Sequence, residues 1–251
     1  MLINEDEKKY TLFVSDLHLS EHTPELNQEF LRLLAGKAKQ ADALYILGDF
    51  FEMWIGDDDK TPYNDAIIAA IKQFSEVKPV YFMAGNRDFM VGHVFARSSG
   101  CQLLTDPTVI NLYGKRTLLT HGDFLCTQDK GHIAFRRCTQ KRWLQKLLLK
   151  LPLSWRSRLG KGLRKQSKQR SKRISTTLMD INQLALETMM QQHRVKQLIH
   201  GHTHRPSIHY FHLKGEPVCH VVLNDWDQVG YMLIYRADHT MRLTTTKDPG
   251  Y

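Results

Sequence analysis

Seven side chains with metal-binding donor atoms follow short apolar runs of this sequence. They are carboxylates, imidazoles and one amide: Asp16, His18, Asp49, Asn86, His121, His202 and His204. This mixture of oxygen and nitrogen donors suits divalent ions such as Mn²⁺, Fe²⁺ or Zn²⁺ better than a thiolate site would. Each fragment alone is weak evidence, because an isolated histidine usually caps a strand or hydrogen-bonds internally. Five fragments in order are stronger, and they predict a metal centre.

Asp49 is the natural ligand for two ions to share. One carboxylate can hold two cations about 3.5 to 4 Å apart while offsetting part of their repulsion, and the preceding Gly48 permits close backbone approach. Two ions lower the pKa of a bridging water toward neutrality, so that hydroxide can attack phosphorus in line. The predicted chemistry is hydrolysis of a phosphodiester or phosphoanhydride without a protein nucleophile.

The elements that must position these donors can be read from apolar periodicity. Buried strands are predicted at 11–16, 43–49, 80–86, 117–123 and 197–202, and helices at 25–39 and 63–76. Alternating strands and helices predict a largely parallel sheet, with ligand chemistry at the carboxyl ends of its strands. Residues 218–225 and 230–238 alternate more like antiparallel strands, which predicts a second sheet packed on the first.

Length and composition bound the class of protein. The chain has 251 residues, 42% of them hydrophobic, which is enough for one α/β domain with an insertion. Its first residues lack the basic start and apolar stretch of a secretory signal, and no apolar run approaches the roughly 18 to 20 residues that span a bilayer. The four cysteines form no CxxC pair, so we expect reduced thiols in the cytoplasm.

The formal net charge of +9 is concentrated in one segment. Lys130 to Met179 contains sixteen Lys and Arg and no Asp or Glu, whereas the remainder contains nineteen Lys and Arg and twenty-six Asp and Glu. Pro152 and Gly160 are expected to interrupt its helices. The charge is interleaved mainly with leucine rather than with base-stacking aromatics, which disfavours a nucleic-acid partner. A solvated basic face remains the plain alternative. One helical face carries Trp143, Leu144, Leu147, Leu148 and Leu151.

The motifs DLH, GDFFEMW, GNRD, HGD and GHTH, in this order from about Thr11 to Pro206, resemble the calcineurin-like metallophosphoesterase superfamily. The resemblance implies a four-layer α-β-β-α sandwich in a single domain, 1–251, with a basic helical insertion at about 127–185 that acts as a lid. It also implies two divalent ions. One would be held by Asp16, His18, Asp49 and His204, and the other by Asp49, Asn86, His121 and His202.

Arg87 narrows the substrate, because many members of this superfamily have histidine after the asparagine of the third motif. Arginine cannot donate a proton near neutral pH, but its planar fork grips phosphate oxygens in pairs. A good leaving group makes an acid unnecessary, so we expect a phosphoanhydride substrate. The predicted catalytic residues are Asn86, Arg87 and His121.

Longer strings, including WIGDDD, GNRDF and HGHTHRP, look like the UDP-2,3-diacylglucosamine diphosphatase family of lipid A biosynthesis. That resemblance implies hydrolysis to UMP and 2,3-diacylglucosamine 1-phosphate, usually with Mn²⁺, by water attacking the α-phosphorus. It implies a peripheral location on the cytoplasmic face of the inner membrane, where the insertion, including Arg156, Arg158 and Lys161, would meet anionic head groups. The implied substrate contacts are Asn86, Arg87, Asp129, Ser167 and His202.

The sequence departs from this family at Ser171 and Ile174, where an asparagine and a lysine that bind substrate are expected. Those contacts are in doubt, and whether Lys172 or Arg173 replaces them stays open. Asp57 to Asp59 lack the further donors of a calcium loop and are expected to form a solvated turn. Alternative functions are a two-metal nuclease or general phosphodiesterase, and a catalytically dead scaffold. The sequence does not indicate the oligomeric state.

Overall fold

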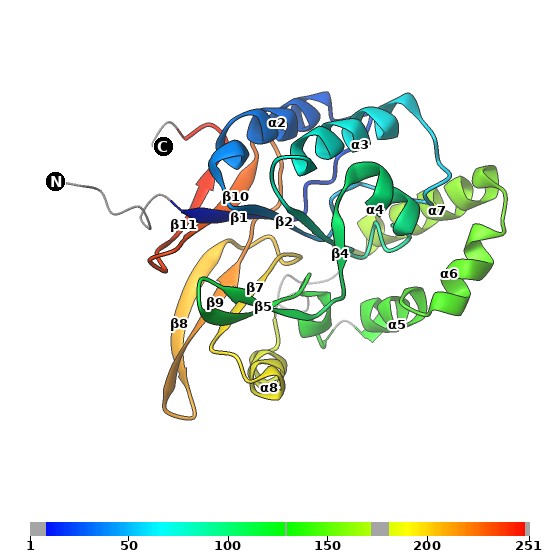
Figure 1. The fold of residues 1–251 in the computed structure, drawn as a ribbon. Coiled ribbons are helices and arrows are strands. Elements are labelled where there is room, and N and C mark those ends of the chain that lie inside the picture. The colour runs from blue at the N-terminus through cyan, green and yellow to red at the C-terminus, as the bar shows by residue number, and fades with distance from the viewer. Residues whose placement is uncertain (1–8, 129, 172–180, 249–251) are drawn as a thin grey trace.

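Two β-sheets lie face to face and carry helices on their outer surfaces (Figure 1). The computed structural model describes residues 9–128, 130–171 and 181–248. The six-stranded sheet has the order β11-β10-β1-β2-β3-β4, and the five-stranded sheet has the order β5-β6-β7-β9-β8. The predicted four-layer α-β-β-α arrangement with a helical insertion is confirmed.

The six-stranded sheet has a parallel part and an antiparallel edge. Strands β1 to β4 are parallel, as predicted for β1, β2 and β3, and β4 was not predicted. Strand β10 pairs antiparallel with β1, and β11 pairs antiparallel with β10. We expected residues 230–238 in the second sheet, and this was wrong. The segment joins the first sheet because it is apolar on both faces, as a strand inside a sandwich must be. The strands are β1 Tyr10–Val14, β2 Ala43–Leu47, β3 Val80–Met83, β4 Gln102–Leu104, β10 Tyr231–Arg236 and β11 Met241–Thr245.

The five-stranded sheet keeps its parallel strands in the middle. Strands β6, β7 and β9 are parallel, and the edge strands β5 and β8 pair antiparallel with β6 and β9. The second predicted sheet is therefore present, but it is mixed rather than antiparallel. Its strands are β5 Thr108–Leu112, β6 Lys115–Leu119, β7 Gln197–His200, β8 Ser207–Leu213 and β9 Glu216–Val222.

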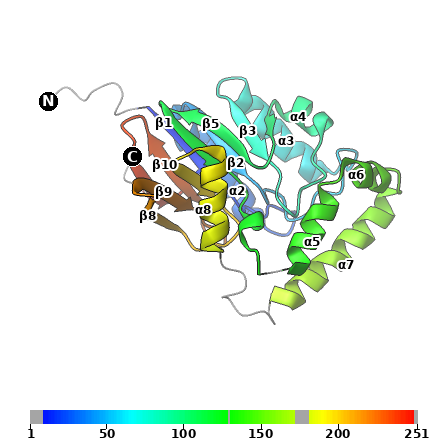
Figure 2. The same cartoon turned by 90° about the horizontal axis from the view of Figure 1, so that it is seen from below.

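Helices α2, α3 and α4 cover the outer face of the first sheet, and α8 covers the second (Figures 1 and 2). Both α2 and α3 begin at a proline, which suits the first helical turn. The Thr61 side chain caps α3 and the Asn182 side chain caps α8, each accepting a backbone N–H. The bounds are α2 Pro24–Ala35, a 3₁₀ turn Lys37–Gln40, α3 Pro62–Ser75, α4 His93–Ser99 and α8 Gln183–His193.

Alternation along the strands divides the core into layers. Leu12 and Val14 of β1 pack against the helices, while Phe13 between them packs between the two sheets. All three side chains are fully buried. Because both faces of β1 are covered, its sequence is a continuous apolar run, and its polar residues begin only where the strand ends.

The basic insertion forms three helices grouped beside the sandwich (Figure 2). Pro152 separates α6 from α7 as predicted, but Gly160 does not interrupt the helix. The sulfur of Met53 occupies the space that a Cβ at Gly160 would need, so this glycine permits close packing. No helix within the described ranges has both the length and the apolar composition needed to cross a bilayer. The helices are α5 Lys130–Thr139, α6 Arg142–Leu149 and α7 Leu153–Ser171, and a 3₁₀ turn, Asp123–Leu125, precedes them.

Candidate metal centre and substrate pocket

The seven predicted ligands lie in loops that follow β1, β2, β3, β6 and β7, and the fold brings them to one edge of the sandwich. Donor atoms of Asp16, His18 and His204 all lie within 4.8 Å of one another, as do those of Asp16, Asp49 and His121. Asn86 adjoins this cluster, because its Oδ1 lies 3.2 Å from Nε2 of His121. The ring of His202 lies 5.0 Å from that of His121, between centroids. Asp16 belongs to both donor groups.

Left-handed backbone is concentrated at these residues. Five of the seven have positive φ: Asp16 at 54°, His18 at 51°, Asp49 at 51°, His202 at 68° and His204 at 55°. For a residue with a Cβ this conformation costs roughly 1 to 3 kcal/mol, and it persists where the surrounding structure fixes it. Backbone hydrogen bonds from Asp16 N to Gly48 O, 3.0 Å, and from His18 N to Asp49 O, 3.1 Å, supply that constraint.

Two glycines let the loops approach each other. Gly48 has a φ of 90°, and a Cβ there would overlap the ring of His121. At Gly201 a Cβ would overlap the hydroxyl of Ser15 and the carboxylate of Asp16. At these two positions, before Asp49 and His202, only glycine fits without a clash. The sequence predicted such a close approach at Gly48.

Unpaired buried atoms at this edge fit a cation. Oδ2 of Asp16 accepts hydrogen bonds from the hydroxyl of Ser15 and from His202 N, the latter at 2.8 Å. Both ring nitrogens of His18 are buried, and within the described residues neither has a hydrogen-bond partner. Oδ1 of Asp16 is also buried, and it lies 3.4 Å from Nε2 of His204. Leaving a buried polar group unpaired costs about 1 to 3 kcal/mol. A divalent ion would satisfy these atoms, so the donors present fit a metal site.

Hydrogen bonds at the back of two histidines fix which nitrogen faces the cluster. Nδ1 of His121 donates to Leu47 O at 3.0 Å, so its Nε2 faces Asp49, with 3.7 Å between Nε2 and Oδ1. Nδ1 of His204 lies 3.0 Å from Oδ2 of Asp225. Such partners orient metal-binding imidazoles. Sequence reasoning missed Asp225, although this residue follows the apolar run of β9, as the predicted ligands follow theirs.

The pKa values show a concentration of negative charge. Burial lowers the pKa of His121, but the carboxylates of Asp49, Asp16 and Asp123 outweigh burial and raise it to about 9. Burial likewise lowers the pKa of His204, but the carboxylates of Asp16 and Asp225 on either side of its ring raise it to about 10. Burial raises the pKa of Asp16, but His204 and His121 hold it well below its ordinary value. Protons therefore balance the carboxylates, and metal ions would displace them.

Asp88, the acid of the GNRD string, ties two of the metal-side loops together. Its carboxylate accepts backbone N–H groups from Gly85 at 2.6 Å and from Phe50 at 2.8 Å. Burial and the nearby charge of Asp49 raise its pKa to about 7. Sequence reasoning gave this residue no role, and the structure shows that it fixes the approach of the loops after β2 and β3.

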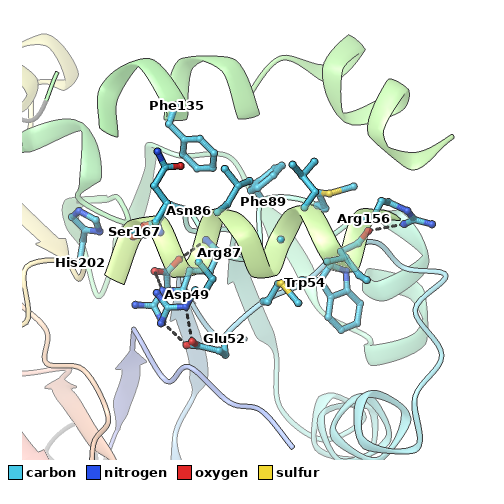
Figure 3. A pocket seen from close by; sticks show the side chains of 18 of the residues that line it. Asp49, Glu52, Trp54, Asn86, Arg87, Phe89, Phe135, Arg156, Ser167 and His202 are labelled. Carbon is cyan, nitrogen blue, oxygen red and sulfur yellow. Dashed lines mark hydrogen bonds and ion pairs between the residues drawn. The ribbon is translucent and has the colours of Figure 1, made fainter. Parts of the chain in front are cut away.

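A pocket of about 640 Å³ adjoins the cluster (Figure 3). Four of the five predicted substrate contacts line this pocket: Asn86, Arg87, Ser167 and His202. Asp129 and residues 172–174 lie outside the described residues, and Ser171 ends α7. One end is lined by polar residues, Asp49, Asn86, Arg87, Ser167, His202 and His204. The pocket is also lined by apolar residues, Met53, Trp54, Ile55, Phe89, Phe135, Leu148, Leu159 and Leu163. Trp54 and the buried Arg156 lie on the side away from His202 (Figure 3).

Arg87 is held at the polar end of this pocket by two carboxylates. Its backbone N–H donates to Oδ1 of Asp49 at 2.9 Å, and its Nε lies 3.3 Å from Oδ2 of the same residue. Its Nη1 donates to Oε2 of Glu52 at 2.5 Å. The side chain is 17% exposed, so its guanidinium has a defined orientation beside the predicted ligands.

Two expectations about charged residues need correction, one on Arg156 of the insertion and one on the turn at Asp57 to Asp59. Arg156 is 4% exposed, pairs with Asp58 and donates to Ile55 O at 2.6 Å, so it does not meet a membrane. The predicted turn at Asp57 to Asp59 is present, but it is not merely solvated. The carboxylate of Asp57 accepts the backbone N–H groups of Gly92, Val94 and Phe95 at the start of α4.

Comparisons with known proteins agree with this geometry. A family model described as calcineurin-like phosphoesterase matches residues 10–206. A curated protein of Coxiella burnetii named UDP-2,3-diacylglucosamine hydrolase is 48% identical over 95% of this chain and 98% of its own length. Proteins of the same name are 48% identical in Aeromonas hydrophila, over 90% and 94%, and 49% identical in Escherichia coli, over 91% and 95%.

Proposed function

The chain belongs to the calcineurin-like phosphoesterases, and we propose that it hydrolyses UDP-2,3-diacylglucosamine to UMP and 2,3-diacylglucosamine 1-phosphate. The observation that carries this proposal is one pocket with two ends, a cluster of metal donors and an apolar chamber. Such a substrate has a pyrophosphate for the first end and acyl chains for the second. The named relatives, 48 to 49% identical over nearly the whole chain, support the same reaction.

We assign two divalent ions to the donor cluster, with Mn²⁺ as the proposed metal. Asp16, His18, Asp49 and His204 would hold one ion, and Asp49, Asn86, His121 and His202 the other. The left-handed loops, the two donor groups and the unpaired ring nitrogens of His18 support this assignment. When bound, such a pair supplies an activated water at neutral pH and offsets charge on the phosphate.

The chain's own residues would orient the pyrophosphate. Arg87 presents a guanidinium fixed by Asp49 and Glu52, and a guanidinium grips phosphate oxygens in pairs. Asn86 lines the pocket, and the buried His121 lies behind it, with Nε2 3.2 Å from Oδ1 of Asn86. Attack at the phosphorus of the UMP moiety expels a sugar phosphate, which leaves without a proton donor. An arginine at position 87 therefore suits this substrate.

The insertion would shelter the acyl chains. Leu148 of α6 and Leu159 and Leu163 of α7 line the pocket together with Phe89, which belongs to the GNRDF string. Apolar chains buried against these side chains gain about 25 cal/mol per Å² removed from water. Acyl chains offer no hydrogen bonds, so the pocket would recognise them through the apolar surface that they bury.

The outer side of the insertion would rest on the membrane that contains the lipid. Trp143 is 63% exposed, Trp155 62% and Leu147 53%, and all three belong to the strongly basic segment. Exposed aromatic and aliphatic side chains beside Lys and Arg are typical of peripheral binding to anionic bilayers. We therefore propose a peripheral location on the cytoplasmic face of the inner membrane.

UMP release tests the reaction. Purified protein with Mn²⁺ should release UMP from UDP-2,3-diacylglucosamine in mixed micelles, and chelation should stop it. UDP-N-acetylglucosamine, which lacks the acyl chains, should be a much poorer substrate. In ¹⁸O-labelled water the label should appear in UMP. Label in the sugar phosphate would refute attack at the UMP phosphorus, and cleavage of single-stranded DNA without UMP release would favour a nuclease.

A further inference from the structure

Glu52 lies between the metal-side loops and the insertion (Figure 3). It is the glutamate of the GDFFEMW string. Its Oε2 accepts a hydrogen bond from Nη1 of Arg87, and its Oε1 accepts one from Nε of Arg164, each at 2.5 Å. Arg87 follows β3 beside the metal donors, whereas Arg164 belongs to α7. One carboxylate thus links two arginines that are far apart in the sequence, and all three side chains line the pocket.

We infer that Glu52 is a positioning residue, which holds Arg87 and Arg164 together at the phosphate end of the pocket and thereby fixes α7 over the site. This inference rests on the proposed function for its substrate. Neither Glu52 nor Arg164 is among the predicted ligands or substrate contacts.

Charge explains why an acid is needed between these two side chains. Two guanidinium groups that approach each other repel, and one carboxylate between them replaces repulsion with two ion pairs. The trio keeps one net positive charge for an anionic substrate. Glu52 engages Nη1 of Arg87 and Nε of Arg164, and Asp49 lies by Nε of Arg87. These contacts leave Nη2 of Arg87 and both Nη groups of Arg164 to donate to phosphate oxygens.

A second contact anchors α7 independently of Glu52. Arg156 is buried and pairs with Asp58 at the start of the helix. It precedes Arg164 by eight residues, about 12 Å along the helix axis. By contrast, the side chains of Glu52 and Arg164 are 33% and 29% exposed and border the pocket. Loss of Glu52 should therefore loosen the pocket end of α7 while Arg156 keeps the insertion folded.

Amide hydrogen exchange and kinetics test this inference in the full-length protein. The variants are Glu52→Ala, Glu52→Gln, Arg164→Ala and the Glu52→Ala/Arg164→Ala double variant. Glu216→Ala is the control, because Glu216 pairs with Lys196 on the surface, away from the pocket. Exchange is followed in peptides covering residues 157–167, kcat/KM by UMP release, and metal binding by titration with Mn²⁺.

We expect Glu52→Ala to speed exchange in α7 several-fold and to lower kcat/KM by about 10- to 100-fold, the range for losing hydrogen bonds to charged groups. Glu52→Gln keeps an acceptor oxygen and should lie between Glu52→Ala and the wild type. In α7 exchange the double variant should match either single variant, because both remove the same link. In kcat/KM it should lose less than the product of the two single losses, because the two effects are coupled. Mn²⁺ binding should be unchanged in every variant, and Glu216→Ala should match the wild type.

Independent effects of Glu52→Ala and Arg164→Ala that multiply in the double variant would overturn the inference. Unchanged exchange in α7, or loss of Mn²⁺ binding in Glu52→Ala and Glu52→Gln, would also overturn it. If the wild type releases no UMP while Glu52→Ala still speeds exchange in α7, the proposed function fails but the link between Glu52 and α7 stands.

Discussion

His204 lies between two carboxylates, with Nδ1 at 3.0 Å from Oδ2 of Asp225 and Nε2 at 3.4 Å from Oδ1 of Asp16. Asp225 follows β9, whereas Asp16 follows β1, so the contact joins the two sheets at the site. The hydrogen bond to Asp225 fixes the ring so that Nε2 is directed at the donor cluster. This is the usual arrangement around a metal-binding histidine.

Replacing Asp225 should weaken metal binding without removing a predicted ligand. We expect Asp225→Ala to lower Mn²⁺ affinity by about 10- to 100-fold, because His204 loses its orienting partner. UMP release should fall at limiting Mn²⁺ and recover at excess Mn²⁺. Isothermal titration and metal-dependent kinetics measure both effects. Asp227→Ala is the control, because Asp227 is exposed and its carboxylate accepts the backbone N–H of the neighbouring Gln228. Equal Mn²⁺ affinity in Asp225→Ala and the wild type would exclude this role.

Metal affinity should rise with pH. The pKa values of His121 and His204 are raised to about 9 and about 10, so both rings bind protons in the metal-free protein at neutral pH. Ligation needs neutral imidazole, and lowering the proton concentration therefore favours the metal. Apparent affinity should increase from pH 6 to pH 8, with protons released on binding. Titration calorimetry in buffers of different ionisation enthalpy measures this release, and binding without proton release would contradict the raised pKa values.

Arg136 should be the most stability-sensitive arginine of the insertion. It is 3% exposed, donates to Gly85 O at 3.0 Å and to Asp106 at 2.8 Å, and lies 2.8 Å from Asp123. Arg136→Ala removes the buried positive charge beside Asp106 and Asp123, and we expect a loss of about 3 to 5 kcal/mol in the free energy of unfolding. Denaturant titration measures it. Arg137→Ala, on the exposed side of α5, should change stability little, and equal losses for both variants would refute the distinction.

Membrane binding should depend on exposed aromatic residues rather than on Arg156. The double variant Trp143→Ala/Trp155→Ala should bind anionic vesicles roughly tenfold more weakly or worse, because binding scales with apolar area buried at the interface. Activity on a micellar substrate should change less. Vesicle co-sedimentation measures binding, and Tyr210→Ala is the control, since Tyr210 is 73% exposed on β8, outside the insertion. Undiminished vesicle binding by the double variant would place the membrane contact elsewhere.

Strands and donors could be predicted because both are local signals. An apolar run followed by a polar residue indicates where a strand ends, and parallel strands bring their carboxyl ends to one edge. Contacts between residues that are far apart in the sequence leave no such local pattern. Nothing in the basic segment, with its sixteen Lys and Arg, shows that Arg136 and Arg156 turn inward. Their burial depends on Asp106, Asp123 and Asp58. Asp225 was missed for the same reason.

Two local patterns were misassigned because each has two physical meanings. A glycine inside a basic run can end a helix or permit close packing, and at Gly160 the sulfur of Met53 decides for packing. Alternating residues near the C-terminus suggested a one-sided antiparallel sheet, yet in β10 both alternating sets are apolar. Met232 and Ile234 face the helix side, while Leu233 and Tyr235 lie between the sheets. Both sets of side chains are apolar because β10 pairs with β1 inside the sandwich, where both faces of the strand are covered.

Removing and restoring the metal tests the two-metal hydrolysis most directly. Protein stripped by a chelator is titrated with Mn²⁺, and bound metal per chain is measured together with UMP release from UDP-2,3-diacylglucosamine. We predict no UMP release from the stripped protein and full recovery as two ions bind per chain. His18→Ala should bind less metal and should not turn over. UMP release at the full rate by metal-free protein, or by His18→Ala, would contradict the proposed site.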